Sequence, residues 1–311
     1  MTWTADDLGD LTGRAVLVTG ANSGLGLRSA EALAAHGARV LMACRNREKG
    51  EAARAAVAAQ AGATAPELVS LDLADLTSIE TAAKEVANKV ERLDGLLNNA
   101  GVMAMPHCRT VDGFEMQFGT NHLGHYALTA RLLPLLLAAP EPRVVTTSST
   151  MHRIGRMKWD DLQHEHRYSK WPAYGQSKLA NLLFAFELDR RAKLARTALR
   201  SVAAHPGYAD THLQAAGPEM SGGVLGRLNA RAMGLTNSVF AQTDAAGALP
   251  QLRGLVEPDI VGGEFFGPGG FAEMHGSPVV VKPKKAAYDT EAAAKLWDLS
   301  AELTGVSFDW P

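Results

Sequence analysis

Residues 15–36 read AVLVTGANSGLGLRSAEALAAH. The apolar run up to Thr19 predicts a buried strand, and the segment from Gly24 to His36 predicts the helix after it. Glycines between them allow a tight turn, close approach of a pyrophosphate and close packing of helix on strand, and the helix N-terminus offers free N–H groups to phosphates. Such a turn is weak evidence alone, and it could be purely structural. As the first strand–turn–helix unit of an alternating chain, it predicts a dinucleotide site.

The same alternation of apolar runs and helical patterns continues along the chain. It predicts further strands over residues 38–43, 68–71, 95–97, 143–147, 199–204 and 263–266, and further helices over 48–61, 77–90, 114–138, 171–195, 239–255 and 290–303. Strands that are apolar on both faces and alternate with helices indicate a parallel sheet covered on both sides. The prediction is an α/β fold: a single doubly wound Rossmann-type domain over 1–311, with about seven mostly parallel strands flanked by helices on both faces.

Two segments depart from this alternation. Residues 210–238 are rich in Gly, Met and Leu, and a long irregular insertion in a compact domain is usually functional. We interpret it as a lid over a hydrophobic substrate, with a loop that packs on a partner subunit as the alternative. A C-terminal amphipathic helix is expected at about 287–304.

The composition excludes several classes of protein. The chain is 46% hydrophobic and 21% charged, with a net charge of −2, which argues against nucleic acid as the main partner. Two cysteines cannot form a disulfide framework, and no Cys-x-x-Cys suggests zinc. His164 and His166 could suggest a metal, but they lack acidic or cysteine partners at recognisable spacing, so no metal is expected. Without a signal peptide or an apolar run long enough to cross a bilayer, a soluble, cytoplasmic protein is expected.

The end of the second predicted strand bears on the choice of cofactor. NAD-binding folds of this type usually carry an acid there for the ribose 2′-hydroxyl, and NADP-binding ones place an arginine nearby. Here Cys44 stands at that position and Arg45 follows it. Arg can pair with a 2′-phosphate that a carboxylate would repel. NADP(H) is therefore favoured over NAD(H), with Arg45 and Arg47 as solvated surface charges as the alternative.

A tyrosine and a lysine indicate proton chemistry. Tyr174 and Lys178 lie four residues apart on a predicted helix and so project from one face. A free phenol has a pKa near 10, and a neighbouring ammonium together with oxidised nicotinamide would lower it. Ser148 and Ser149 follow the fifth predicted strand, where a hydroxyl would face the ligand crevice. The spacing is common by chance on helix surfaces, and both serines could simply cap the strand.

At this point the residues resemble the classical short-chain dehydrogenases/reductases, from about residue 12 to 270. The resemblance is carried by Thr19-Gly-x-x-x-Gly-x-Gly26, Asn98-Asn-Ala-Gly101, Asn121, Ser149, Tyr174-x-x-x-Lys178 and Pro206-Gly-x-x-x-Thr211. Residues 43–46, 120–125 and 177–181 are similar to the retinol dehydrogenases and the oxidoreductase that carries WW domains.

The resemblance implies roles for individual residues. It implies that Ser149, rather than Ser148, acts with Tyr174 and Lys178, and that Asn121 holds a water that relays protons from Lys178. The implied cofactor-binding residues are Gly20, Asn22, Ser23, Gly24, Leu25, Gly26, Arg45, Asp72, Leu73, Asn99, Ala100, Gly101, Tyr174, Lys178, Pro206, Gly207 and Thr211. Among them Asp72 would accept from the adenine amine, or alternatively is an ordinary acid near a helix N-cap, and Thr211 would bond the nicotinamide carboxamide. A homodimer or homotetramer is also implied.

These observations predict an NADP(H)-dependent oxidoreductase that interconverts an alcohol and a carbonyl. Hydride transfer would be assisted by Tyr174 as general acid/base, and the small-molecule substrate would be a lipophilic aldehyde, ketone or retinoid-like compound. A cofactor-binding sensor or scaffold on the same fold is the alternative, but the joint presence of Asn121, Ser149, Tyr174 and Lys178 argues against it. The glycine spacing and the lack of a long substrate domain disfavour a nucleotide-sugar epimerase or dehydratase.

Overall fold

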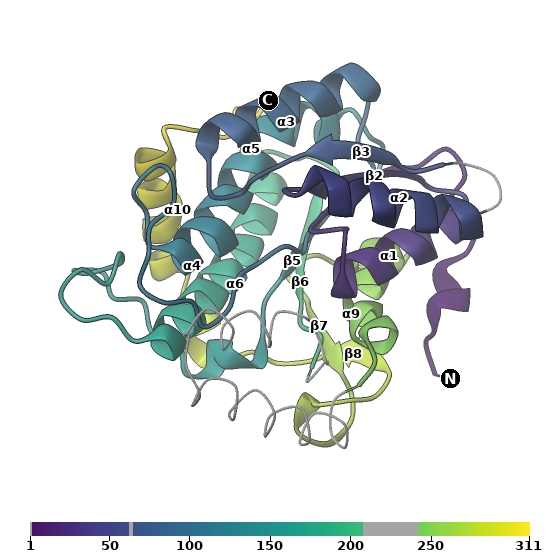
Figure 1. The fold of residues 1–311 in the computed structure, drawn as a ribbon. Coiled ribbons are helices and arrows are strands. Elements are labelled where there is room, and N and C mark those ends of the chain that lie inside the picture. The colour runs from purple at the N-terminus through teal and green to yellow at the C-terminus, as the bar shows by residue number, and fades with distance from the viewer. Residues whose placement is uncertain (1, 62–64, 208–241) are drawn as a thin grey trace, which may run out of the picture.

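Eight strands form one sheet among the residues described by the computed structural model, which are 2–61, 65–207 and 242–311 (Figure 1). Their order across the sheet is β3-β2-β1-β4-β5-β6-β7-β8, and only β8 runs antiparallel to its neighbour among these eight. The strands are β1 (Ala15–Thr19), β2 (Arg39–Cys44), β3 (Glu67–Ser70), β4 (Gly95–Asn98), β5 (Arg143–Thr147), β6 (Arg200–Ala204), β7 (Phe265–Pro268) and β8 (Pro278–Val280).

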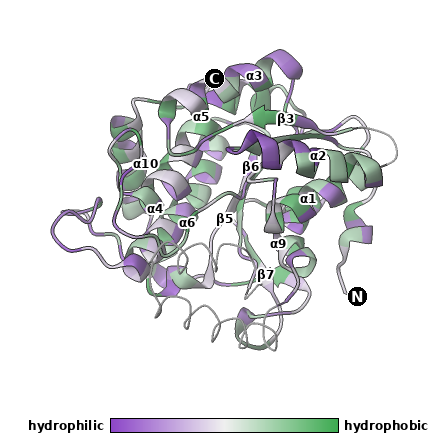
Figure 2. Ribbon diagram, in the orientation of Figure 1, coloured by the Kyte–Doolittle hydropathy of each residue, from purple (hydrophilic) through white to green (hydrophobic). Residues whose placement is uncertain are grey.

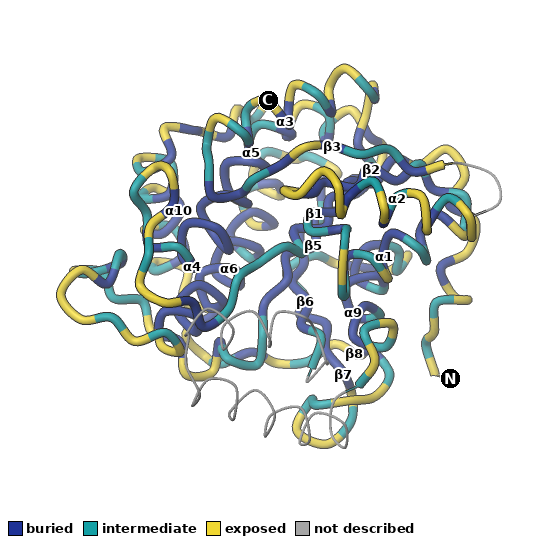
Figure 3. Tube along the Cα trace, in the orientation of Figure 1, coloured by how far each residue is buried: buried dark blue, intermediate teal, exposed yellow. Residues whose placement is uncertain are grey.

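Helices cover both faces of this sheet. One face packs against α1 (Gly24–Ala35), α2 (Arg47–Ala61) and α9 (Asp244–Val256). The other packs against α3 (Leu76–Lys89), α5 (Gly124–Leu137) and α6 (Lys170–Leu194). The central strands are buried while the outer surfaces of the helices are exposed (Figure 3).

Alternation along β1 shows how one strand serves both layers. Val16 and Val18 pack with the α1, α2 and α9 side, whereas Leu17 packs with the α3, α5 and α6 side. Successive side chains of a strand point to opposite faces, so a strand with helices on both faces is apolar at most of its positions. The hydrophobic colouring of the inner elements follows this rule (Figure 2).

A further helix, α10 (Thr290–Thr304), lies against α6 and α5. Its Trp297 stacks on Phe184 with ring centroids 5.9 Å apart and meets Phe308 at 4.4 Å. His122 Nε2 lies 2.8 Å from the Ser300 hydroxyl, which is also buried. The face of α6 that carries Phe184 is therefore covered by α10, a helix from much later in the chain.

The predicted α/β architecture is confirmed, and all seven predicted strands are present with ends shifted by at most two residues. The eighth strand, β8, was not predicted. It has three residues and begins at Pro278, with Val279 and Val280 exposed, so it carries neither the length nor the alternation by which a strand is recognised.

Two predicted helices differ from the observed ones, one in its continuity and the other in where it begins. The helix predicted over 114–138 contains α4 (Met116–Phe118), a π turn (Gly119–Leu123) and then α5. The helix predicted over 239–255 begins at Asp244 after the cap Thr243, whose hydroxyl accepts from Ala246 N at 3.2 Å. The insertion at 210–238 and Thr211 lie outside the described residues. No helix in the described part of the chain is long and apolar enough to span a membrane.

Candidate active site

The glycine-rich turn between β1 and α1 is too tight for larger residues. Gly20 and Gly24 have positive φ, at 67° and 52°, a region that favours glycine. A Cβ on Gly26 would lie 2.3 Å from the Gly20 carbonyl oxygen and 2.6 Å from Asn99 Nδ2. Ser23 takes the N-cap position of α1, and its side chain makes no capping hydrogen bond. The first N–H groups of α1 are thus not satisfied by that side chain, as suits a phosphate site.

Thr19 joins the carboxyl ends of β1 and β4. Its buried Oγ1 accepts hydrogen bonds from the backbone N–H groups of Asn99 (2.9 Å) and Ala100 (3.0 Å). Asn99 Nδ2 in turn donates to the Thr19 carbonyl at 2.8 Å. The strand order reverses between these two strands, and ligands of open α/β sheets bind at such a switch point. Sequence reasoning gave Thr19 no role of its own.

The end of β2 carries the residues that bear on cofactor choice. Cys44 is buried, and desolvation raises the pKa of its thiol to about 11. Arg45 is exposed. No carboxylate occupies the end of the strand, as the sequence indicated.

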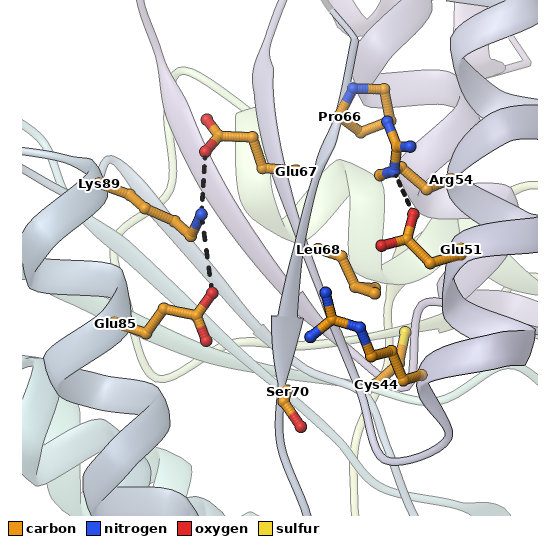
Figure 4. Close-up of a pocket in the computed structure, with 10 residues that line it drawn as sticks. Cys44, Glu51, Arg54, Pro66, Glu67, Leu68, Ser70, Glu85 and Lys89 are labelled. Carbon is orange, nitrogen blue, oxygen red and sulfur yellow. Dashed lines mark hydrogen bonds and ion pairs between the residues drawn. The ribbon is translucent and has the colours of Figure 1, made fainter.

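A pocket of about 310 Å³ lies beside this strand end, between α2, β3 and α3 (Figure 4). Within it Arg54 pairs with Glu51 at 2.7 Å, and Lys89 pairs with Glu67 at 3.3 Å and Glu85 at 3.6 Å. Those cations are therefore neutralised. Arg47 also lines this pocket and makes no ion pair with any other described residue.

Tyr174 and Lys178 project from α6 and are both buried, at 4% and 3% exposed. Lys178 Nζ donates to the Thr147 carbonyl at 3.1 Å and lies 5.7 Å from the centroid of the Tyr174 ring. Burial raises the pKa of Tyr174 to about 12 and lowers the pKa of Lys178 to about 8. In the protein alone the pKa of the Tyr174 phenol is raised rather than lowered as expected, because desolvation outweighs the lowering effect of Ser149.

Ser149 and Ser148 have different surroundings. The Ser149 side chain lies close enough to Tyr174 to lower the phenol pKa, against the larger effect of burial. Its Oγ also accepts from Met151 N at 3.2 Å, which caps the 3-10 turn Thr150–Arg153. Ser148 is buried and donates to the Lys178 carbonyl at 2.8 Å. The structure thus brings Ser149 to Tyr174 and uses Ser148 to hold α6.

Asn121 lies in the π turn, and its side chain is fully engaged with the protein. Its Oδ1 accepts from Val102 N at 2.8 Å, and its Nδ2 donates to the Val102 carbonyl and the Ser177 hydroxyl, each at 2.9 Å. A Cβ on Gly101 would lie 3.0 Å from Asn121 Oδ1 and 3.5 Å from Lys178 Nζ. Asn121 therefore ties the loop after β4 to α6 beside Lys178. Its role in holding a water stays a prediction.

The remaining predicted residues lie at neighbouring strand ends. Asp72 and Leu73 follow β3, where the Asp72 carboxylate accepts from Ala74 N at 2.9 Å, so its proposed contact with adenine stays a prediction. Pro206 and Gly207 follow β6, and Gly207 has a positive φ of 69°.

The two histidines considered as metal ligands, His164 and His166, lie in different environments. His164 is buried with Nδ1 at 3.2 Å from Lys158 Nζ, whereas His166 is exposed. Among the residues that the structure describes, no three His, Cys, Asp or Glu side chains gather as a metal site.

Known proteins resemble this chain over most of its length. The sequence pattern of the short chain dehydrogenases matches residues 14–221. Retinol dehydrogenase 14 of Mus musculus is 39% identical over 96% of this chain and 88% of its own length. Retinol dehydrogenase 11 of Homo sapiens is 38% identical over 96% of this chain and 88% of its own length.

Solved structures agree with these sequence matches. An uncharacterized protein from Mycobacterium paratuberculosis is 43% identical with a TM-score of 0.80, covering 99% of this chain and 100% of that one. A short chain dehydrogenase from Shigella flexneri 2a str. 301, complexed with NADP, is 25% identical with a TM-score of 0.60, covering 79% of this chain and 92% of that one.

Proposed function

Because the chain belongs to the short-chain dehydrogenase/reductase family, we propose that it uses NADP(H) and that Tyr174 transfers the proton. Its relatives include the retinol dehydrogenases, and it is therefore an oxidoreductase of alcohols or carbonyls. The observation that carries this proposal is the group formed by buried Tyr174 and Lys178 with partly buried Ser149, beside the strand ends where the glycine turn lies.

The residues present fit a dinucleotide. A Cβ on Gly26 would clash with the Gly20 carbonyl, so glycine there lets α1 pack closely against the turn. The uncapped start of α1 suits a pyrophosphate. Asn22, Ser23, Gly24 and Leu25 keep partial exposure along this turn. When bound, the nicotinamide supplies or accepts the hydride.

NADP(H) is favoured over NAD(H) by the end of β2. Exposed Arg45 follows buried Cys44, so a 2′-phosphate would meet a guanidinium rather than a carboxylate. The similar protein from Shigella flexneri was solved with NADP, which is consistent with the same preference here.

The protein's own part in the reaction is to move a proton and hold the reacting oxygen. In carbonyl reduction, the Tyr174 hydroxyl donates its proton to the substrate oxygen while Ser149 donates a hydrogen bond to the same oxygen. In alcohol oxidation the phenolate accepts that proton. The Lys178 ammonium stabilises the phenolate, and the burial that raises the pKa of Tyr174 to about 12 makes such stabilisation necessary.

The names of the relatives support a lipophilic substrate. Several are retinol dehydrogenases, so an aldehyde, a ketone or a retinoid-like alcohol is proposed here. The oligomeric state stays a prediction of a homodimer or homotetramer.

A panel of carbonyls and alcohols that includes retinal and retinol, run with NADPH and NADH, tests the proposal. We expect NADPH-dependent reduction of a lipophilic carbonyl and a loss of about 100-fold or more in Tyr174→Phe, with NADPH binding retained. Full activity in the phenylalanine variant would overturn the mechanism. Tight NADPH binding without turnover of any compound would favour a sensor or scaffold.

A further inference from the structure

The turn between β7 and β8 has a strained backbone. Ala272 and Glu273 both have positive φ, at 52° and 58°, and in the described parts of the chain they are the only consecutive pair of such non-glycine residues. Positive φ is unfavourable for residues with a Cβ and persists only where surrounding contacts impose it.

Glu273 contacts side chains from two other segments. Its Oε1 accepts a hydrogen bond from Arg153 Nη2 at 2.7 Å, and its Oε2 lies 3.2 Å from His205 Nε2. The His205 side chain is fully buried, whereas Glu273 is 20% exposed. The imidazole of His205 is the main cause that lowers the pKa of Glu273 to about 2, with Arg153 also contributing. The carboxylate is therefore ionised across the working range of pH.

The tautomer of His205 follows from its other partner. The backbone N–H of Gly207 donates to His205 Nδ1 at 3.1 Å, so Nδ1 is the acceptor and the proton lies on Nε2. The protonated Nε2 thus lies 3.2 Å from Glu273 Oε2 without any need for a charged imidazole, although the two atoms do not meet in hydrogen-bond geometry. A chain of contacts runs from Glu273 through His205 to the backbone of Gly207.

The same turn also touches Gly207 directly. A Cβ on Gly207 would lie 2.5 Å from the Met274 carbonyl oxygen and 2.9 Å from the Glu273 carbonyl oxygen. On the other side, Arg153 ends the 3-10 turn that Ser149 caps. His152 in that turn contacts the Ser149 carbonyl through Nδ1 at 2.6 Å.

We propose that Glu273 is a positioning residue that fixes the loop of Ser149 relative to the Pro206–Gly207 segment. The inference rests on the proposed function, in which Ser149 contacts the substrate oxygen, and on the prediction that Pro206 and Gly207 bind the cofactor, where they would line the nicotinamide. The Arg153–Glu273 ion pair and the contact of Glu273 with His205 together link the two segments, and so hold the oxygen-binding hydroxyl at a defined place with respect to the hydride. Neither Arg153 nor His205 touches Tyr174 in any described contact, so Glu273 acts through Ser149 and Gly207.

Binding and turnover together test this role. Glu273→Ala should lower kcat, normalised to the concentration of NADPH-binding sites, about tenfold to 100-fold, since small misplacements of reacting groups have effects of that size. It should also weaken NADPH several-fold while leaving 2′,5′-ADP, which lacks the nicotinamide, unchanged. Glu273→Asp should recover part of both losses. The matched control is Glu257→Ala, which removes an equally short ion pair to Arg253 at 2.6 Å outside these loops.

Two outcomes overturn the inference. One is a Glu273→Ala variant with wild-type kcat and an unchanged ratio of NADPH to 2′,5′-ADP affinity. The other is an equal fractional loss of kcat in the wild-type and Ser149→Ala backgrounds, because residues that act through one another are not additive. If the wild-type protein binds NADPH but reduces nothing, the proposed function fails, and the affinity ratio still decides the role of Glu273.

Discussion

Asn99 and Thr19 are joined by two hydrogen bonds across 80 residues of sequence: Asn99 N donates to Thr19 Oγ1 at 2.9 Å, and Asn99 Nδ2 donates to the Thr19 carbonyl at 2.8 Å. Ala100 N donates to the same hydroxyl at 3.0 Å. The Thr19 side chain therefore links the carboxyl ends of β1 and β4 at the point where the strand order reverses.

Thr19→Val tests this junction. Valine keeps the shape but leaves two backbone N–H groups without their acceptor, at about 1–3 kcal/mol each. We expect the free energy of unfolding, measured by urea denaturation, to fall by about 2–4 kcal/mol and NADPH affinity to fall with it. Thr19→Ser keeps the acceptor and should stay near wild type. A valine variant with an unchanged midpoint would show that the hydroxyl contributes little.

Lys178→Met should make the protein inactive and more stable at neutral pH. The folded-state pKa of Lys178 is lowered from 10.5 to about 8 by burial, so the charged form is disfavoured on folding by on the order of 3 kcal/mol. Between pH 8 and 10.5 the unfolded chain binds more protons at this residue, so the stability of the wild type rises with pH there.

The advantage of the methionine variant should therefore shrink over the same pH range. Urea denaturation at pH 7 and at pH 10 measures this difference. Lys49→Met, at an exposed position, serves as the control and should show no such dependence. A methionine variant less stable than wild type at pH 7 would mean that the bond from Lys178 to the Thr147 carbonyl outweighs desolvation.

Arg45→Asp tests the cofactor preference. Losing a charge-assisted hydrogen bond to a phosphate is worth about 1.5–3 kcal/mol, so NADPH affinity should fall roughly ten- to 100-fold while NADH affinity is kept or improved. The control Arg14→Asp makes the same change of charge just before β1, at the amino ends of the strands, whereas Arg45 lies at their carboxyl ends. Isothermal titration with both cofactors measures the ratio. Equal losses in the two variants would point to a general field rather than to a contact with the 2′-phosphate.

The sequence was sufficient for features that repeat or that lie close together along the chain. The β1–turn–α1 unit and the spacing of Tyr174 and Lys178 are local, so pattern and chemistry could predict them. The π turn around Asn121 is invisible to an apolar pattern because a helix continues on both sides of it. The contacts of Thr19 and Glu273 reach partners far along the chain, Asn99 for Thr19 and both Arg153 and His205 for Glu273, and no local pattern reports such contacts.

The short strand β8 has a consequence for self-association. Because β7 pairs with β6 on one side and β8 on the other, its backbone offers no free edge to another molecule. Among the strands that the structure describes, the outermost on this side is β8, which begins with Pro278, a residue without an N–H to donate, and is three residues long. Short edges with proline are poor templates for intermolecular sheet growth and aggregation. A second copy that approached this end of the sheet would have to bind through side chains rather than extend the sheet.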